Sequence, residues 1–180
     1  MSAKKIIALS GDIQIGKSTL ISKLLAHTDR PISGFMTKLQ RDNPIEGKGW
    51  PLYIYPANVP EEERTQSEAN LIGFPMQHDF DSCARTFNSY GAALLTDIPA
   101  GHLIVMDEIG VLESKAEIFK EAILNCLRSD NPVILTIKAK PVYPFVEQVK
   151  ALAGEENYYW VTEENRDRLA EELASVVEKW

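Results

Sequence analysis

The sequence has little cysteine, and its cysteines do not form a metal-binding pattern. Among 180 residues there are 2 cysteines, Cys83 and Cys126, which are too far apart for the paired-cysteine spacing of a zinc site. Unpaired cysteine is among the residue types most often buried in folded proteins. We therefore expect two buried, reduced thiols and no zinc site.

Long apolar runs are also missing. The first run, residues 6–9, ends at Ser10 and Gly11, and it is shorter than the hydrophobic region of a signal peptide. No apolar stretch approaches the ~18 residues that span a bilayer. We expect a cytoplasmic protein with no membrane association.

An excess of positive charge is the third absence. The chain has 19 Lys and Arg against 26 Asp and Glu, a formal net charge of −7. Proteins that bind nucleic-acid backbones gather Lys and Arg on one face, so no nucleic-acid partner is expected. The hydrophobic content of 44% and charged content of 25% are typical of a folded domain. We predict one domain over residues 1–180.

Short apolar runs alternate with helical patterns along the chain, which is typical of an α/β fold with a largely parallel sheet. Ser114 and Glu117 have the spacing of a capping box at the start of one helix. Strands are predicted at residues 5–10, 103–106, 132–137 and 158–161, and helices at 17–27, 81–95, 114–127, 144–152 and 163–178.

A β-hairpin is predicted over residues 32–55, with strands at 32–39 and 50–55 joined by turn-forming residues. Of the aromatic residues Trp50, Tyr53 and Tyr55 there, Tyr53 and Tyr55 are two positions apart, which predicts that these two share one face of the sheet rather than form a base-stacking platform. Residues 57–80 contain an acidic run and few apolar residues. We expect this segment to be a mobile connection.

A phosphate-binding loop stands between the first predicted strand and the first predicted helix. Residues 11–18 fit the pattern G-x-x-x-x-G-K-[ST], in which backbone N–H groups and a helix N-terminus surround phosphate oxygens. We expect Lys17 to neutralise the β- and γ-phosphates and the Ser18 hydroxyl to bind Mg²⁺. The predicted nucleotide-binding residues of this loop are Gly11, Asp12, Ile13, Gln14, Ile15, Gly16, Lys17, Ser18 and Thr19.

Two adjacent carboxylates, Asp107 and Glu108, follow the apolar run 103–106 and have the form of a Walker B element. Ligands bind at the carboxyl ends of parallel strands, so both carboxylates are predicted to face the same nucleotide as Lys17. We assign Asp107, with Ser18, to the Mg²⁺ shell. Glu108 is assigned to orienting or deprotonating the attacking water, so Lys17 and Glu108 are the predicted catalytic residues.

The chain resembles the small stand-alone P-loop nucleoside-triphosphatases of the thermophile or cancer-related type (THEP-like). Asp-Glu-Ile-Gly is the most specific part of this resemblance, which covers most of the chain. The segments that carry it are residues 11–20, 34–37, 107–110 with Leu112 and Glu113, and Val161-Thr162 with residues 165–167.

The resemblance implies a three-layer P-loop NTPase fold and Mg²⁺-dependent hydrolysis of nucleoside triphosphates to diphosphate and phosphate. The substrate would be ATP or GTP with weak base selectivity, because the guanine-recognition element Asn/Thr-Lys-x-Asp is not matched at residues 136–139. No protein partner is indicated by the sequence.

Three positions depart from the family's pattern. Relatives usually have glycine where Gln14 stands, which suits a positive φ. In the hairpin, residues 47–50 contain one cation in place of a more basic pattern, so a phosphate contact from there is not expected. Lys138 replaces a histidine after the strand 132–137, and Thr136 of that strand remains able to reach toward phosphate.

Asn165 and Arg166 have two interpretations. The resemblance places them at the nucleotide, as a base pocket or an arginine finger. The structural alternative is that Thr162 caps the last helix and Arg166 only forms a salt bridge.

Two other functions share the predicted machinery. A P-loop kinase would transfer phosphate to a small acceptor, but it would need several arginines in a lid, and residues 57–80 offer only Arg64. A nucleotide-dependent switch would use slow hydrolysis to reset its state.

Overall fold

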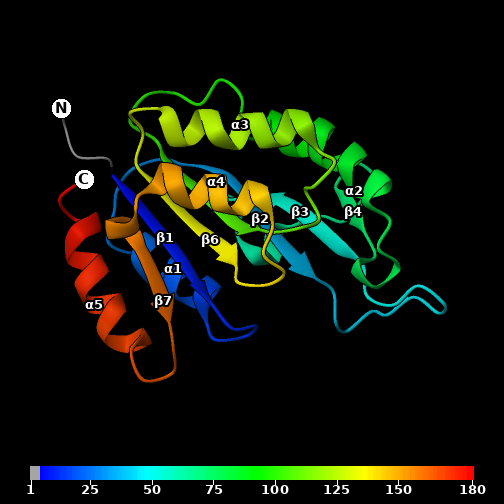
Figure 1. Cartoon of the computed structure of the whole chain (residues 1–180), viewed down its shortest axis with the longest axis horizontal. Helices are drawn as coiled ribbons and strands as arrows, with labels where there is room; N and C mark the ends of the chain where they lie inside the picture. The colour runs from blue at the N-terminus through cyan, green and yellow to red at the C-terminus, as the bar shows by residue number, and fades with distance from the viewer. Residues whose placement is uncertain (1–4) are drawn as a thin grey trace.

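Seven strands form one sheet in the order β4-β3-β2-β5-β6-β1-β7 (Figure 1). The computed structural model describes residues 5–180. The strands are β1 (Ile6–Gly11), β2 (Ile32–Leu39), β3 (Leu52–Pro56), β4 (Leu71–Gly73), β5 (Leu103–Ile109), β6 (Val133–Lys138) and β7 (Tyr158–Val161). β3 pairs antiparallel with both β2 and β4, and β2, β5, β6, β1 and β7 run parallel to one another. The predicted α/β fold, a largely parallel sheet with an added hairpin, is confirmed.

Helices cover both faces of the sheet and complete three layers. The α1 and α5 helices lie on one face, and α3 and α4 lie on the other (Figure 1). The helices are α1 (Lys17–Leu25), α2 (Phe80–Thr86), α3 (Glu117–Arg128), α4 (Pro144–Ala153) and α5 (Arg166–Val177). Shorter helical turns are η1 (Glu61–Glu63), η2 (Pro75–Gln77), η3 (Phe87–Gly91) and η4 (Glu155–Asn157).

Alternate residues of β5 belong to two separate apolar cores. Leu103 and Val105 pack with buried residues of α1 and α5, whereas Ile104 and Met106 pack with those of α3. A strand buried on both faces needs such an unbroken apolar run. Asp107 follows Val105 by two positions and points to the same face, toward α1.

Gly34 lets β2 lie close against β5. Its φ is 106°, and a Cβ at this position would lie 2.0 Å from the carbonyl oxygen of Val105. Glycine is therefore required for this approach. The resulting register places Met36 of β2 opposite Asp107 of β5.

The segment 57–80, which the sequence predicts to be a mobile connection, contains the strand β4 and the helical turns η1 and η2. The side chain of Asn70 is buried and donates hydrogen bonds to the carbonyl oxygens of Ile54 and Thr65. It also accepts one from the backbone N–H of Ser67. A buried polar side chain with all these partners fixes the path of the segment beside β3.

The capping box predicted at Ser114 is wrong. α3 begins at Glu117 after Ala116, and no side chain caps it. A backbone turn precedes the helix instead, in which the N–H of Ser114 donates to the carbonyl oxygen of Val111. The N–H of Ala116 donates in the same way to Glu113, so backbone partners replace the expected side-chain cap.

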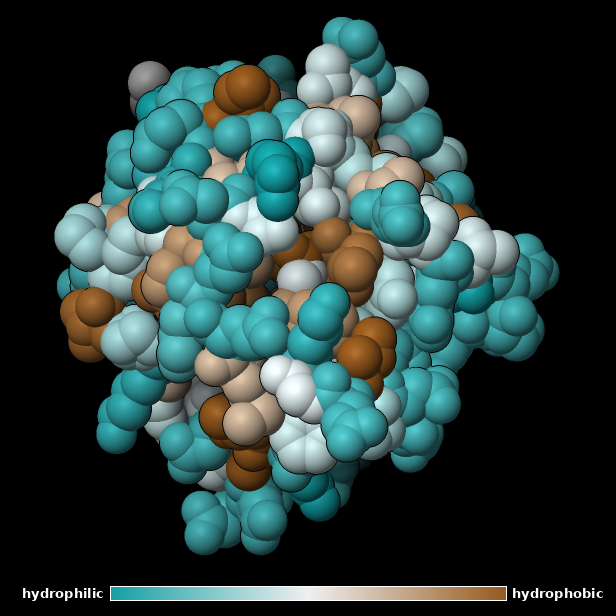
Figure 2. Space-filling model, turned by 90° about the vertical axis from the view of Figure 1, so that its right-hand side faces the viewer, coloured by the Kyte–Doolittle hydropathy of each residue, from teal (hydrophilic) through white to brown (hydrophobic). Residues whose placement is uncertain are grey.

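Both cysteines are buried and unpaired, as predicted. Burial raises the pKa of Cys83 to about 11 and that of Cys126 to about 12. The surface over the end of the molecule that carries α2 and β4 is mainly hydrophilic, with smaller apolar areas near its middle (Figure 2). Within residues 5–180, no helix is both long enough and apolar enough to cross a membrane.

Candidate active site

The phosphate-binding loop joins β1 to α1 with three residues at positive φ, of which Gly11 has a φ of 152°. Gln14 has a φ of 61° and Gly16 a φ of 102°. The φ of Gln14 confirms the backbone conformation that was inferred from the glycine that relatives have at position 14. A Cβ on Gly11 would lie 2.6 Å from the carbonyl oxygen of Val161, so this glycine lets the loop start close to β7.

Lys17 lies under the loop and is buried. Its ammonium donates hydrogen bonds to the carbonyl oxygens of Gly11 at 3.2 Å and Asp12 at 3.0 Å. The same ammonium lies 3.6 Å from the carboxylate oxygen Oε2 of Glu108. The structure therefore brings together the two residues predicted to be catalytic.

The two predicted metal ligands contact each other. The Ser18 hydroxyl donates to Oδ2 of Asp107 at 2.7 Å, and the Thr136 hydroxyl donates to Oδ1 of the same carboxylate. Thr136 thus orients Asp107, a role that sequence analysis did not assign. A lone hydroxyl side chain within the otherwise apolar run of β6 is the signal that could have suggested it.

Adjacent hydroxyl and carboxylate oxygens are the ligands that Mg²⁺ prefers, so the donor set fits a hard divalent cation. In the part of the chain that the structure describes, no cluster of three or more His, Cys, Asp or Glu residues could hold a metal ion. A cation at Ser18 and Asp107 would complete its shell with phosphate oxygens and water.

Glu108 lies between two lysines. Lys17 approaches one carboxylate oxygen, and Lys138 lies 4.0 Å from the other. Burial raises the pKa of Glu108 above its ordinary value, and the two lysines act in the opposite direction. Lys138, which stands where relatives have a histidine, therefore faces Glu108, the proposed base. Asp107 and Glu108 lie within β5, beyond the predicted strand end at Met106, and the peptide bond joining them is cis.

Glu113 is a buried acid beside the site that sequence analysis noted only as part of the family resemblance. Its carboxylate accepts a hydrogen bond from the N–H of Gly110 at 2.9 Å, and its exposed fraction is 2%. Burial raises the pKa of Glu113 to about 7. The acid closes the turn that follows the Walker B carboxylates, so it fixes where β5 ends.

The structure separates the roles of Asn165 and Arg166. The Asn165 side chain accepts from the N–H of Thr162 and donates to the carbonyl oxygen of Trp160, both at 2.8 Å. In return, the hydroxyl of Thr162 accepts from the N–H of Asn165. This reciprocal pair starts α5 at Arg166, later than the predicted residue 163.

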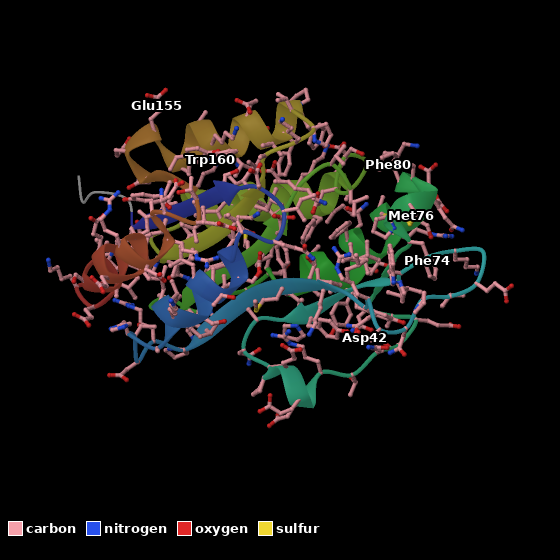
Figure 3. All side chains as sticks on the ribbon, turned by 90° about the horizontal axis from the view of Figure 1, so that it is seen from below. Asp42, Phe74, Met76, Phe80, Glu155 and Trp160 are labelled. Carbon is pink, nitrogen blue, oxygen red and sulfur yellow. The ribbon has the colours of Figure 1, made fainter. Side chains whose placement is uncertain are left out.

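Arg166 reaches the phosphate-binding loop, since its guanidinium donates to the carbonyl oxygen of Ile15 at 3.3 Å. A groove with a volume of about 270 Å³ lies there, lined by Gly16, Thr19, Leu20, Lys23, Arg166 and Asp167. Trp160 lies in β7, a few residues before Arg166 in the chain. Figure 3 shows it far from Phe74 and Met76, which lie at the opposite end of the sheet.

Known proteins match almost the whole chain. A family model described as NTPase matches residues 6–174. The nucleoside-triphosphatase THEP1 of Thermotoga sp. (strain RQ2) is 36% identical over 172 residues, which cover 95% of this chain and 94% of that relative. The nucleoside-triphosphatase THEP1 of Aquifex aeolicus is 24% identical over 180 residues, or 96% and 99% of the two chains.

A crystal structure agrees with the fold. THEP1 from the hyperthermophile Aquifex aeolicus superposes with a TM-score of 0.56 at 22% identity, covering 96% of this chain and 99% of that one. The resemblance inferred from the motifs is confirmed by the family model and by relatives matched over nearly their full length. This chain therefore belongs to the NTPase family.

Proposed function

We propose that this protein is a Mg²⁺-dependent nucleoside-triphosphatase that converts ATP or GTP to the diphosphate and phosphate. The observation that carries the proposal is the convergence of Lys17, Ser18, Asp107 and Glu108 at the carboxyl ends of β1 and β5. Membership of the NTPase family favours hydrolysis over transfer of phosphate to another acceptor.

The loop at residues 11–19 would hold the phosphates. Backbone N–H groups and the N-terminal end of α1 favour anions there. The Lys17 ammonium bonds to carbonyl oxygens of its own loop. The β- and γ-phosphate oxygens are stronger acceptors because they carry full charge, so Lys17 would turn toward them when the substrate binds.

Ser18 and Asp107 would hold Mg²⁺, the serine directly and the aspartate through water. The bound ion would neutralise charge on the β- and γ-phosphate oxygens. Thr136 and Ser18 both donate to Asp107, so the carboxylate is held in place on the face toward α1.

Glu108 would accept the proton of the attacking water. The water oxygen forms a bond to the γ-phosphorus, and the bond from that phosphorus to the bridging oxygen breaks, which releases the diphosphate. Burial makes the Glu108 carboxylate more basic than in water. Lys138 would continue to neutralise it after Lys17 turns toward phosphate.

We further propose that base selectivity is weak. The Asn165 amide is bonded to backbone atoms of its own turn, so it is not free to read a base. The guanidinium of Arg166 lies at the loop, where it would contact phosphate or ribose rather than a base edge. Affinity would then come mainly from the phosphates and the metal ion.

The test is phosphate release from ATP, GTP, CTP and UTP, with Mg²⁺ or with a chelator, for the wild type, Glu108→Gln and Glu121→Gln. Glu121 is an exposed acid of α3 that pairs with Arg128, which makes it the matched control. We expect Glu108→Gln to retain nucleotide binding and to lower the rate by about 10²-fold or more. Equal rates for both variants would refute the role of Glu108, and a rate unaffected by the chelator would refute metal dependence.

A further inference from the structure

A row of three side chains crosses the sheet from the proposed metal site. Asp107 of β5 is the registered neighbour of Met36 of β2, and Met36 is in turn the neighbour of Tyr55 of β3. Registered neighbours on adjacent strands point to the same face. Met36 packs with the core formed by α1 and α5, so the row lies on the face that carries the phosphate-binding loop.

The guanidinium of Arg64 lies over this row. Its central carbon is 5.5 Å from the centroid of the Tyr55 ring, and its Nη2 is 3.5 Å from the sulfur of Met36. Because Met36 is beside Asp107, the charged end of Arg64 lies one strand away from the proposed metal ligand. The Nε of Arg64 donates to the carbonyl oxygen of Val59, and this hydrogen bond holds the guanidinium group in place.

Arg64 has donors available for an anion. A thioether is a weak acceptor, so the contact with Met36 does not satisfy Nη2. Within the described chain, no carboxylate forms an ion pair with Arg64, whereas its neighbour Lys38 is paired with Glu61. A guanidinium stacked on an aromatic ring keeps its planar fork of N–H groups free to bind oxyanions.

The segment that carries Arg64 is anchored on the side of the sheet that carries α1. Buried Asn70 bonds it to Ile54 and Thr65. Figure 3 shows the η1 turn, which immediately precedes Arg64, on the side of the sheet away from α4 and therefore on the side of α1. A loop held in this way by a buried side chain can present a long side chain to a site beside it.

We propose that Arg64 is a further catalytic residue, which contacts the γ-phosphoryl oxygens of the bound nucleoside triphosphate from within the same chain; this inference rests on the proposed hydrolase function. Lys17 and the α1 N-terminus lie at the end of β1, and Asp107 and Glu108 lie at the end of β5. The γ-phosphoryl group would face β2, where Arg64 lies. The arginine takes no proton and forms no bond to phosphorus, but it stabilises charge on the transferred group and the leaving oxygen.

The test compares the wild type, Arg64→Gln and Arg128→Gln. Arg128 ends α3 and pairs with exposed Glu121, so its loss is the control for removing one arginine. We expect Arg64→Gln to lower kcat by about 100-fold or more, with diphosphate affinity unchanged within about twofold. Affinity for the diphosphate with Mg²⁺ and aluminium fluoride, a mimic of the transferred phosphoryl group, should fall at least about tenfold.

Two outcomes overturn the proposal. One is a kcat for Arg64→Gln within about threefold of the wild type. The other is an equal loss of affinity for the diphosphate and for the aluminium fluoride complex, which would mean that Arg64 only supports the fold. If Arg64→Gln does not fold, Arg64→Lys is the deciding variant. Lysine keeps the positive charge and the aliphatic part of the side chain but lacks the planar guanidinium group. We expect the kcat of Arg64→Lys to be at least about tenfold lower, and full turnover would refute the contact.

The same experiment separates this inference from the proposed function. A wild type that releases no phosphate refutes the hydrolase function. In that case, the affinities of wild type and Arg64→Gln for the diphosphate–aluminium fluoride complex still test the contact between Arg64 and the transferred phosphoryl group. Equal affinities would refute that contact.

Discussion

The ammonium of Lys17 lies 3.6 Å from the carboxylate of Glu108, so the cation of the phosphate-binding loop contacts the proposed base. Lys138 lies 4.0 Å from the other oxygen of that carboxylate. Substrate phosphates would therefore compete with Glu108 for Lys17, and Lys138 would remain beside Glu108. Substrate binding is thereby linked to release of one oxygen of the base.

Lys17→Ala should weaken triphosphate binding strongly while the protein remains folded. The substitution removes the buried cation that we propose to bind the β- and γ-phosphates. Isothermal titration with a triphosphate measures the loss, and circular dichroism checks the fold. Lys115→Ala, which removes an exposed lysine paired with Asp81 away from the loop, is the control. Wild-type affinity in a folded Lys17→Ala protein would refute the assignment of the loop.

Asp107→Asn should raise the Mg²⁺ concentration needed for half-maximal hydrolysis by about tenfold or more, because the amide lacks the charge that attracts the cation. A Mg²⁺ titration at saturating nucleotide measures the change. Asp81→Asn, at an exposed acid paired with Lys115, should leave the Mg²⁺ requirement unchanged. An unchanged requirement in Asp107→Asn would exclude this residue from the metal site.

Gln14→Gly should stabilise the protein slightly, by up to about 1 kcal/mol, and should leave turnover equal or faster. Gln14 has a φ of 61°, which costs energy for a residue with a side chain and none for glycine. Urea denaturation and phosphate release measure the two effects. Gln148→Gly, in the middle of α4, should instead destabilise by about 1 kcal/mol. A tenfold loss of turnover in Gln14→Gly would show that the glutamine side chain contributes to hydrolysis.

Glu113 should make the free energy of unfolding fall as the pH rises from about 4.5 to about 7. Its pKa is about 7 in the folded protein and near the ordinary value of 4.5 when unfolded, so the folded state binds the extra proton in this range. The stabilisation is complete below the lower pKa and is lost above the higher one.

Denaturation across that pH range should therefore show a flatter profile for Glu113→Gln, which remains neutral throughout. Glu117→Gln, at an exposed acid of α3, should keep the wild-type slope. Parallel profiles for wild type and Glu113→Gln would refute the raised pKa.

The kcat/KM values for ATP and GTP should lie within about tenfold, or about 1.4 kcal/mol of transition-state discrimination. The Asn165 side chain, the amide proposed from the sequence to contact nucleotide, is committed to backbone partners. Steady-state kinetics with both nucleotides measure the ratio. A ratio above about a thousand would demonstrate a specific base pocket.

The sequence by itself determined the phosphate-binding loop, the Walker B carboxylates and the parallel sheet that carries them. These features are local, because a glycine-bounded loop, a lysine and a helix start lie within ten residues, and an unbroken apolar run identifies a strand buried on both faces. The positive φ of Gln14 was inferred from the resemblance, because relatives have glycine at this position.

Tertiary structure decided which distant side chains join that loop. Thr136 bonds to Asp107 because β5 and β6 are neighbours, and Arg64 lies near Asp107 because β2 and β3 set the register of Met36 and Tyr55. No short sequence window contains these pairings, because strand register depends on packing across the whole sheet. For the same reason the local capping pattern at Ser114 failed, since the turn closed by buried Glu113 took precedence over it.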